Sequence, residues 1–396
     1  MLKVSTFNPI PFVKPTRLFI ISLTLAAFSI FGNQPSTAFA QGSLTPPGPP
    51  GPTMKSLDQI EARTPISSVP FTISVPGSYY LISNLNLTVN TNAITIVTNQ
   101  VTLDLNGFTI STSVFRGTGN GILLNGGNTD IDILNGHITG GNYQYLNSGI
   151  TYDGPSPVTV HVSNVSVTEC IANGINLGTN GSTLVESCTL QTINVYGIEA
   201  GFVVHSQAQS GNSAIIANFT ASDCVGISVS GEGVLANGTA NNCDGSSYSG
   251  IGVNANNANN CYGVSGAGSY GLNAGTALNC YGYNSGTGIG LYATGAENCV
   301  GSSFNGTGLS AENANSCNGV SHAIGSGSDG LDAETANNCY GSSTSPSGYG
   351  LNIRYVAIGC YGQDTAAGAT AVSASIANSC VGTGTISYSY HYNMPP

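Results

Sequence analysis

The sequence predicts an all-β protein built as a parallel β-helix, a solenoid in which short strands stack turn upon turn. The pattern Ala-x-x-Cys-x-Gly occurs nine times, with its cysteines 18 to 22 residues apart. A glycine followed by an aliphatic residue returns with the same period from Gly233 to Gly350. A repeat this short cannot bury its apolar face alone, so roughly fifteen stacked turns are expected.

Other repeat architectures do not fit this composition. The repeats are rich in Gly and Asn, and two helices with their turns need more than about thirty residues. Leucine-rich repeats need Leu at several fixed positions, whereas one aliphatic position recurs here. From Phe71 onward the apolar residues alternate with polar ones in runs of four to six, broken by Asn-Gly and Gly-Gly, which indicates strands and tight turns.

The first forty residues predict an export signal. Basic residues precede the apolar run Leu18–Phe31, and the small-residue stretch "AFA" ends just before Gln41. The run is too short for a membrane-spanning helix and has the order of a secretory signal peptide. We therefore expect residues 1–40 to be removed and the mature chain to be secreted, or held at the surface of a bacterial cell.

Four further segments follow from changes in composition. Residues 41–66 are predicted as a Pro-rich linker that leads into a short helical N-terminal cap, "MKSLDQIEA". Irregular β-helix turns are expected over 67–220 and regular Cys-containing turns over 221–384. Residues 385–396, with alternating tyrosines, are expected to form a C-terminal cap or tail.

The charge balance excludes several classes of partner. The chain has 18 acidic residues against 7 Lys and Arg, and without the leader the net charge is 4 − 18 = −14. Nucleic acid and anionic lipid surfaces are bound mainly through Lys and Arg, so neither is an expected partner. A neutral polysaccharide or cell-surface glycan remains compatible with this charge.

The N-terminal turns resemble a known superfamily. The stretch "PGSYYLISNLNLTVNTNAITIVTNQVTLDLNGFTI", followed by "GILLNG" and "DIDILNGHITGG", is similar to the opening turns of secreted pectate-lyase-like proteins. The resemblance covers about residues 66–200 and implies a right-handed β-helix. The Cys-containing turns look like repeats of uncharacterised secreted bacterial β-helix proteins. The resemblance indicates the fold and does not identify an activity.

The evenly spaced cysteines predict a column inside the wall. Asn precedes many of them, which indicates a turn where Asn adopts a left-handed conformation. Free Cys behaves as a small buried hydrophobe, so we expect unpaired thiols that fill the wall. Disulfides between neighbouring turns remain an alternative, although the column has an odd number of members. A metal needs ligands that converge on a point, whereas this spacing makes a line.

Tyrosines recur between Cys and Gly, at a position expected to face outward. An exposed column of tyrosines could stack sugar rings, because the ring is apolar and its tip is polar. Packing between the rings of successive turns explains the same pattern. The candidate ligand-binding residues are Tyr262, Tyr281, Tyr340 and Tyr361.

An enzymatic site is the alternative that the resemblance raises. The triplet "NTD" at Asn128–Asp130 matches one polygalacturonase motif, but its partner motifs are absent from the sequence. Glycoside hydrolysis needs paired carboxylates. Asp130 and Asp132 share one strand face, Asp153 is about one turn away, and His137 follows. These four residues are the alternative catalytic set, for a glycoside hydrolase or a lyase.

Lyase chemistry and cofactors have weaker support. The solenoid carries only Arg116 and Arg354 as basic residues, and Arg354 is about ten turns from Asp130. Gly325–Ala333 is one mismatch from a Ca²⁺-binding nonapeptide, but neighbouring turns lack the tandem copies that such sites need. We expect no metal or cofactor, with Ca²⁺ as the one alternative. The expected function is therefore an exported, non-catalytic rod that is structural, adhesive or carbohydrate-binding.

Overall fold

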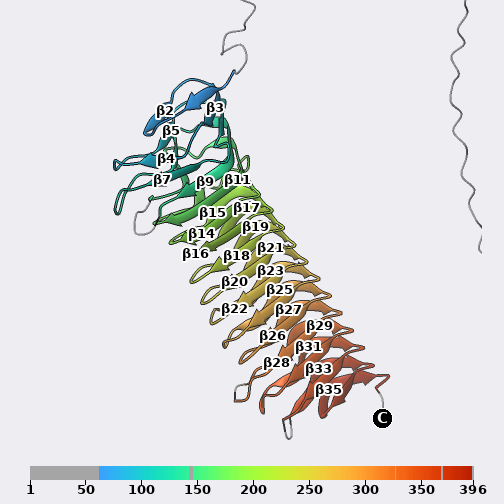
Figure 1. Cartoon of the computed structure of the whole chain (residues 1–396). Coiled ribbons are helices and arrows are strands. Elements are labelled where there is room, and N and C mark those ends of the chain that lie inside the picture. The colour runs from blue at the N-terminus through green and yellow to red at the C-terminus, as the bar shows by residue number, and fades with distance from the viewer. Residues whose placement is uncertain (1–61, 142–145, 326, 367–368, 395–396) are drawn as a thin grey trace, which may run out of the picture. The chain divides into compact units, whose positions relative to one another are not determined.

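The computed structural model describes residues 62–396 apart from 142–145, 326, 367–368 and 395–396. This part of the chain is an all-β parallel solenoid of about 17 turns, with no helix in the described residues (Figure 1). The predicted fold is confirmed, and the turns outnumber the expected count of roughly fifteen. The predicted signal peptide, most of the linker and most of the helical cap lie outside the described residues.

The early turns pass over three flat faces, which we name A, B and C in chain order. Face A starts with β2 (Phe71–Ile73), β5 (Ile94–Ile96), β8 (Ile122–Asn125), β10 (Ile150–Asp153) and β12 (Ile175–Asn176). Face B starts with β1 (Thr64–Ile66), β3 (Gly77–Leu81), β6 (Val101–Asp104), the first halves of β9 (Thr129–Thr139) and β11 (Val158–Cys170), and β13 (Leu184–Glu186). Face C starts with β4 (Leu85–Leu87), β7 (Thr109–Thr112), the second halves of β9 and β11, and β14 (Thr189–Ile193).

From β15 onward each turn has one long strand and one short strand. The long strand bends once, so that its first half belongs to face A and its second half to face B: β15 (Ile198–Val204), β17 (Ile215–Ser222), β19 (Val234–Asn241), β21 (Val253–Asn259), β23 (Tyr270–Leu278), β25 (Ile289–Glu297), β27 (Leu309–Asn315), β29 (Leu331–Asn337), β31 (Tyr349–Ile358), β33 (Thr370–Asn378) and β35 (Thr385–Tyr392). The short strands make face C: β16 (Gln207–Ser210), β18 (Val225–Ser228), β20 (Asp244–Ser247), β22 (Tyr262–Ser265), β24 (Tyr281–Asn284), β26 (Val300–Ser303), β28 (Asn318–Ser321), β30 (Tyr340–Ser343), β32 (Tyr361–Asp364) and β34 (Val381–Thr383).

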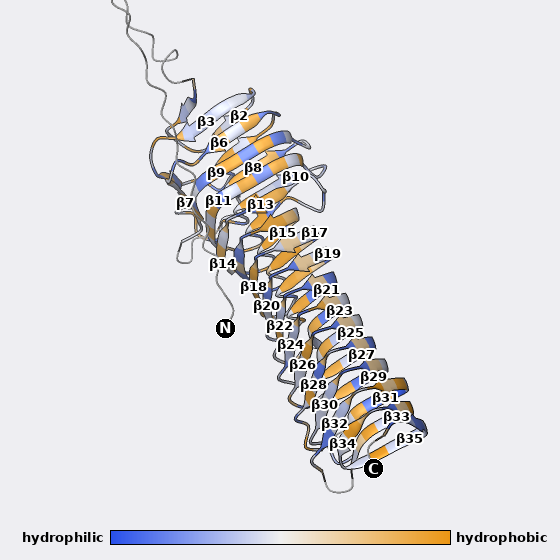
Figure 2. Ribbon diagram, turned by 90° about the vertical axis from the view of Figure 1, so that its right-hand side faces the viewer, coloured by the Kyte–Doolittle hydropathy of each residue, from blue (hydrophilic) through white to orange (hydrophobic). Residues whose placement is uncertain are grey.

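The core changes in character along the solenoid. In the N-terminal turns, alternate residues of each strand are large aliphatics such as Ile94, Ile96 and Leu103, all fully buried. Figure 2 shows this alternation of apolar and polar residues along the strands. Burying each such side chain contributes about 1.5–3 kcal/mol. In the later turns the inward positions hold one Leu or Val with Ala, Cys and Gly, so the core becomes thin.

The recurring glycines let opposite walls of the thin part touch. Gly245 on face C faces Gly252, which precedes the long strand of the next turn. A Cβ placed on either glycine would lie under 3.0 Å from backbone atoms of the opposite wall. Real Cβ atoms do not approach backbone so closely, so only glycine fits. The recurring glycines of the sequence therefore mark the positions at which the two walls are in contact.

The corner between faces B and C is held by left-handed residues. Asn242, Asn260, Asn279, Asn298 and Asn338 have φ between 50° and 54°. Asn tolerates this conformation, as the sequence predicts. The Asn242 side-chain amide also donates a hydrogen bond of 3.1 Å to Asp223 Oδ1 on the previous turn. The corner thus turns the chain sharply and directs the following Cys inward.

A second internal column closes the corner between faces C and A. Ser265 Oγ, for example, donates to the Gly250 carbonyl at 2.7 Å and accepts from the Gly268 N–H at 2.9 Å. Asn284 makes the equivalent pair of bonds one turn later. Asp364 takes the same position in β32, where its Oδ1 accepts from the Ala366 N–H and its buried Oδ2 has no partner. An ionised carboxylate cannot donate the second bond of this column.

Replacing Asp364 with serine is expected to raise the free energy of unfolding by about 1–2 kcal/mol at pH 7, because a hydroxyl can donate where the carboxylate cannot. Burial raises the pKa of Asp364, so the carboxylate costs stability only when it is ionised. The gain should therefore shrink as the pH falls toward the ordinary value for Asp, about 4. Urea unfolding at pH 7 and at pH 4 measures this. A serine variant that is less stable at pH 7 would refute the assignment.

The predicted C-terminal cap is a strand. β35 pairs in parallel with β33 and so adds another layer to faces A and B. Ile386 and Met394 pack partly against the core, whereas Tyr390 is 65% exposed.

Candidate functional site

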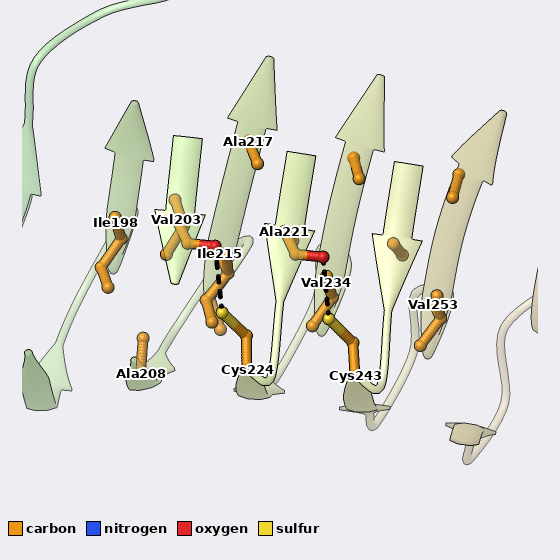
Figure 3. Packing of buried hydrophobic residues seen from close by; sticks show 14 of the residues in the cluster. Ile198, Val203, Ala208, Ile215, Ala217, Ala221, Cys224, Val234, Cys243 and Val253 are labelled. Carbon is orange, nitrogen blue, oxygen red and sulfur yellow. Dashed lines mark hydrogen bonds between the residues drawn. The ribbon is translucent and has the colours of Figure 1, made fainter. Parts of the chain in front are cut away.

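Ten of the cysteines, from Cys188 to Cys380, fill the wall at the corner between faces B and C, whereas Cys170 ends β11 on face C. All eleven are buried and carry free thiols. The Cys224 and Cys243 thiols donate to the carbonyls of Val203 and Ala221, each at 3.4 Å (Figure 3). Among the described residues, no group of three or more His, Cys, Asp or Glu is placed to hold a metal ion. The burial and the free state of these thiols agree with the expected column of unpaired cysteines inside the wall.

The predicted tyrosines lie outward on face C, in register from turn to turn. The column reads Val225, Asp244, Tyr262, Tyr281, Val300, Asn318, Tyr340, Tyr361 and Val381.

These tyrosines pack as two pairs. Tyr262 and Tyr281 stack with ring centroids 5.0 Å apart and planes 8° apart, and Tyr340 and Tyr361 stack at 5.7 Å and 6°. One face of each ring is thus covered by its partner, which is the geometry of packing between turns. The stacked pairs leave only their outer faces for a ligand, so sugar contact at these residues stays a prediction.

The predicted carboxylates Asp130 and Asp132 lie on face B in β9. They line a shallow hollow of about 390 Å³ together with His161. His161 Nδ1 is 3.7 Å from Asp132 Oδ1, and its Nε2 is 3.4 Å from Glu186 Oε2. The sequence reasoning did not include His161 or Glu186 in a site. The intervals of 29 and 25 residues from Asp132 to His161 and on to Glu186 show no regular spacing.

The other two predicted catalytic residues lie elsewhere. His137 is exposed on face C, opposite Thr109 and Ser166 of the neighbouring turns. Asp153 ends β10 on face A and pairs with Asn125. The four residues of the alternative catalytic set are therefore spread over three faces and do not converge on one substrate position.

In the candidate Ca²⁺ segment Gly325–Ala333, the carboxylate of Asp329 is bonded to other groups of the protein. Asp329 Oδ1 accepts from the Tyr349 N–H at 2.9 Å, and Oδ2 accepts from the Asn352 amide at 3.0 Å. Burial raises the pKa of Asp329 to about 6. Both carboxylate oxygens are thus engaged by the protein itself. Of the two arginines considered for lyase chemistry, Arg354 bonds to Glu334 at 2.7 Å and Arg116 lies over the ring of Phe115.

A groove that is not among the sites predicted from the sequence runs along face B. It has a volume of about 780 Å³. Its floor is the backbone around the small, buried alanines that precede each cysteine by three residues: Ala277, Ala296, Ala314 and Ala336. The residues on either side of each alanine point outward and form two walls. The groove therefore runs along the solenoid axis.

Each wall repeats once per turn. The first wall consists of Thr276, Gly295, Asn313, Thr335 and Val356, and the second of Asn259, Leu278, Glu297, Asn315, Asn337 and Ile358. With neighbouring strands about 4.8 Å apart, the six turns of the second wall extend over about 24 Å. The two walls together present amide and hydroxyl groups, a few aliphatic side chains and one carboxylate, that of Glu297.

The walls are partly pre-organised. Thr276 Oγ1 donates to Asn257 Oδ1 at 2.6 Å, and Thr335 Oγ1 donates to Asn313 Oδ1 at 2.7 Å. These contacts between turns fix the side chains while the Asn amide N–H groups stay available to a ligand. Gly295 has no side chain and leaves a gap in the first wall.

Comparison with protein-family models, curated proteins and solved structures finds no match. The described residues also contain no helix that is long and apolar enough to cross a membrane.

Proposed function

We propose that this chain is an exported, non-catalytic solenoid that binds an extended neutral polysaccharide along the groove of face B. The observation that carries the proposal is the in-register stacking of outward side chains, mainly Asn, Thr and aliphatic residues, over five turns in the first wall and six in the second. A shallow, open groove of this length suits a polymer, whereas small molecules are held in enclosed pockets. Contacts that repeat along a polymer add up even when each is weak.

The chemistry of the groove favours a neutral sugar chain. Hydroxyl groups of sugars both donate and accept hydrogen bonds, as do the Asn and Thr side chains of the walls. Aliphatic residues such as Leu278 and Ile358 can cover the apolar faces of the rings. The excess of acidic over basic residues disfavours polyanions. Glu297 is the one carboxylate among the described groove residues, so the groove lacks the pair that hydrolysis needs.

Replacing Asn313, Asn315 and Asn337 with alanine is expected to weaken polysaccharide binding at least about 10-fold, because three amides that each contribute about 0.5–1.5 kcal/mol are removed. Affinity electrophoresis in gels containing neutral polysaccharides measures the change. The matched control is Asn254→Ala with Asn273→Ala, which removes stacked amides from face A.

A second variant separates the groove from the tyrosine column. Changing Tyr262, Tyr281, Tyr340 and Tyr361 to alanine should leave binding within about 3-fold of wild type. Loss of binding in this variant, with the groove variant unaffected, would move the site to face C and refute the groove.

A second candidate function rests on the contacts of His161 with Asp132 and Glu186. Two carboxylates near one imidazole favour a hydrolytic site on the N-terminal turns. The imidazole, however, lies between the carboxylates, in the space that a glycosidic bond would need. We therefore place this function second.

A further inference from the structure

We propose that Glu297 makes the groove selective for a polysaccharide that carries amino groups. This inference rests on the proposed function and names the class of sugar polymer within it. Glu297 lies in the middle of the second wall, in register between Leu278 and Asn315. A sugar chain in the groove would therefore pass directly over its carboxylate.

The Glu297 side chain differs from most other carboxylates of the solenoid in being exposed and without a bonded partner. Elsewhere Glu334 bonds to Arg354 at 2.7 Å, and Glu232 accepts from the Ser213 hydroxyl at 2.7 Å. Within the described part of the chain, the Glu297 side chain forms no hydrogen bond and no ion pair. Its charge is thus free to interact with a ligand.

No nearby cation neutralises this charge. Between residues 62 and 396 the sequence has no Lys and only three Arg side chains, Arg63, Arg116 and Arg354. Arg63 bonds to Asp104, and Arg354 is held by Glu334 on the bend between faces A and B. The neighbours of Glu297 along the groove are uncharged. Among the described residues, Glu297 is therefore the one charged residue that lines the groove itself.

This arrangement discriminates among sugars by charge. An ammonium group on a ring would form a charge-assisted hydrogen bond with Glu297. A uronate at the same position would be repelled. Because the pair is exposed, its contribution is small for one contact, and it is screened by salt. The expected selectivity is accordingly a few-fold and not orders of magnitude.

The test measures the affinity of the full chain for three β-1,4-linked hexasaccharides by calorimetry at low salt. The three are the hexamers of glucose, of N-acetylglucosamine and of glucosamine. We expect the glucosamine hexamer to bind about 3–10-fold more tightly than the other two. Glu297→Gln should reduce this preference and leave the affinity for the glucose hexamer unchanged. The matched control Asp244→Asn removes one charge from face C and should keep the preference.

The outcomes separate the two proposals. A preference for glucosamine that is as large in Glu297→Gln as in the control variant, or no preference in the wild type, overturns the role of Glu297, while neutral binding still supports the groove. If no hexamer binds, both proposals fail. Raising the salt concentration should reduce the preference for glucosamine and leave the affinity for glucose nearly unchanged.

Discussion

Replacing Gly282 with alanine is expected to lower the free energy of unfolding by about 3 kcal/mol or to prevent folding. A Cβ at this position would lie under 3.0 Å from the Gly290 carbonyl oxygen, which is backbone of the opposite wall. Backbone cannot move aside as a flexible side chain can, so the walls would have to separate. Chemical denaturation followed by circular dichroism measures the loss.

The chain provides a matched control in the next strand. Gly295 also lies in a strand, and a Cβ there would meet only the Thr276 methyl group at 3.9 Å. Gly295→Ala should therefore be neutral, or should stabilise by about 0.4–1 kcal/mol through the unfolded state. Equal effects of the two substitutions would show that the walls are not in backbone contact.

The second large effect concerns thiol chemistry. We expect no thiol of the native protein to react with a thiol reagent within minutes. The denatured protein should consume eleven equivalents of the reagent, one for each cysteine of the chain. Access is the reason, because the cysteines are at most 3% exposed. Burial also raises the pKa of Cys170 to about 12, which disfavours the reactive thiolate.

Within the column the thiols perturb one another. Hydrogen bonding with Cys261 raises the pKa of Cys280 to about 11, and the bond with Cys360 lowers that of Cys380 to about 6. Cys380 is fully buried, so it should stay unreactive in the native state. Titration of the denatured, unreduced protein with the reagent gives the count. A count below eleven that returns to eleven after reduction would establish disulfides between turns and refute the free column.

The sequence predicts the repeat and the inward column well because both depend on period alone. Cys and Gly two residues apart must share a face of a strand, and the outward residue between them must lie in register with its equivalents. The contact between Gly245 and Gly252 was not predictable in this way. This contact depends on the distance between two walls. That distance is determined by the combined size of all the inward side chains.

The candidate sites were harder to predict, for physical reasons. The groove forms because small alanines lie between two outward positions. Its walls consist mainly of Asn, Thr and aliphatic residues such as Leu, which carry no reactive group that would mark a site in the sequence. The residues that flank each alanine of the Ala-x-x-Cys-x-Gly pattern were the signal available. His161 and Glu186 were missed because the irregular turns hide which residues lie in register.

One screen tests the central claim of binding without cleavage most directly. The purified protein would be incubated with a panel of neutral and acidic polysaccharides, and both retention on each polymer and the release of new reducing ends or unsaturated products would be measured. We expect retention on neutral polymers with no new chain ends. Cleavage that disappears in Asp132→Asn or Glu186→Gln would contradict the claim and place an active site on the N-terminal turns.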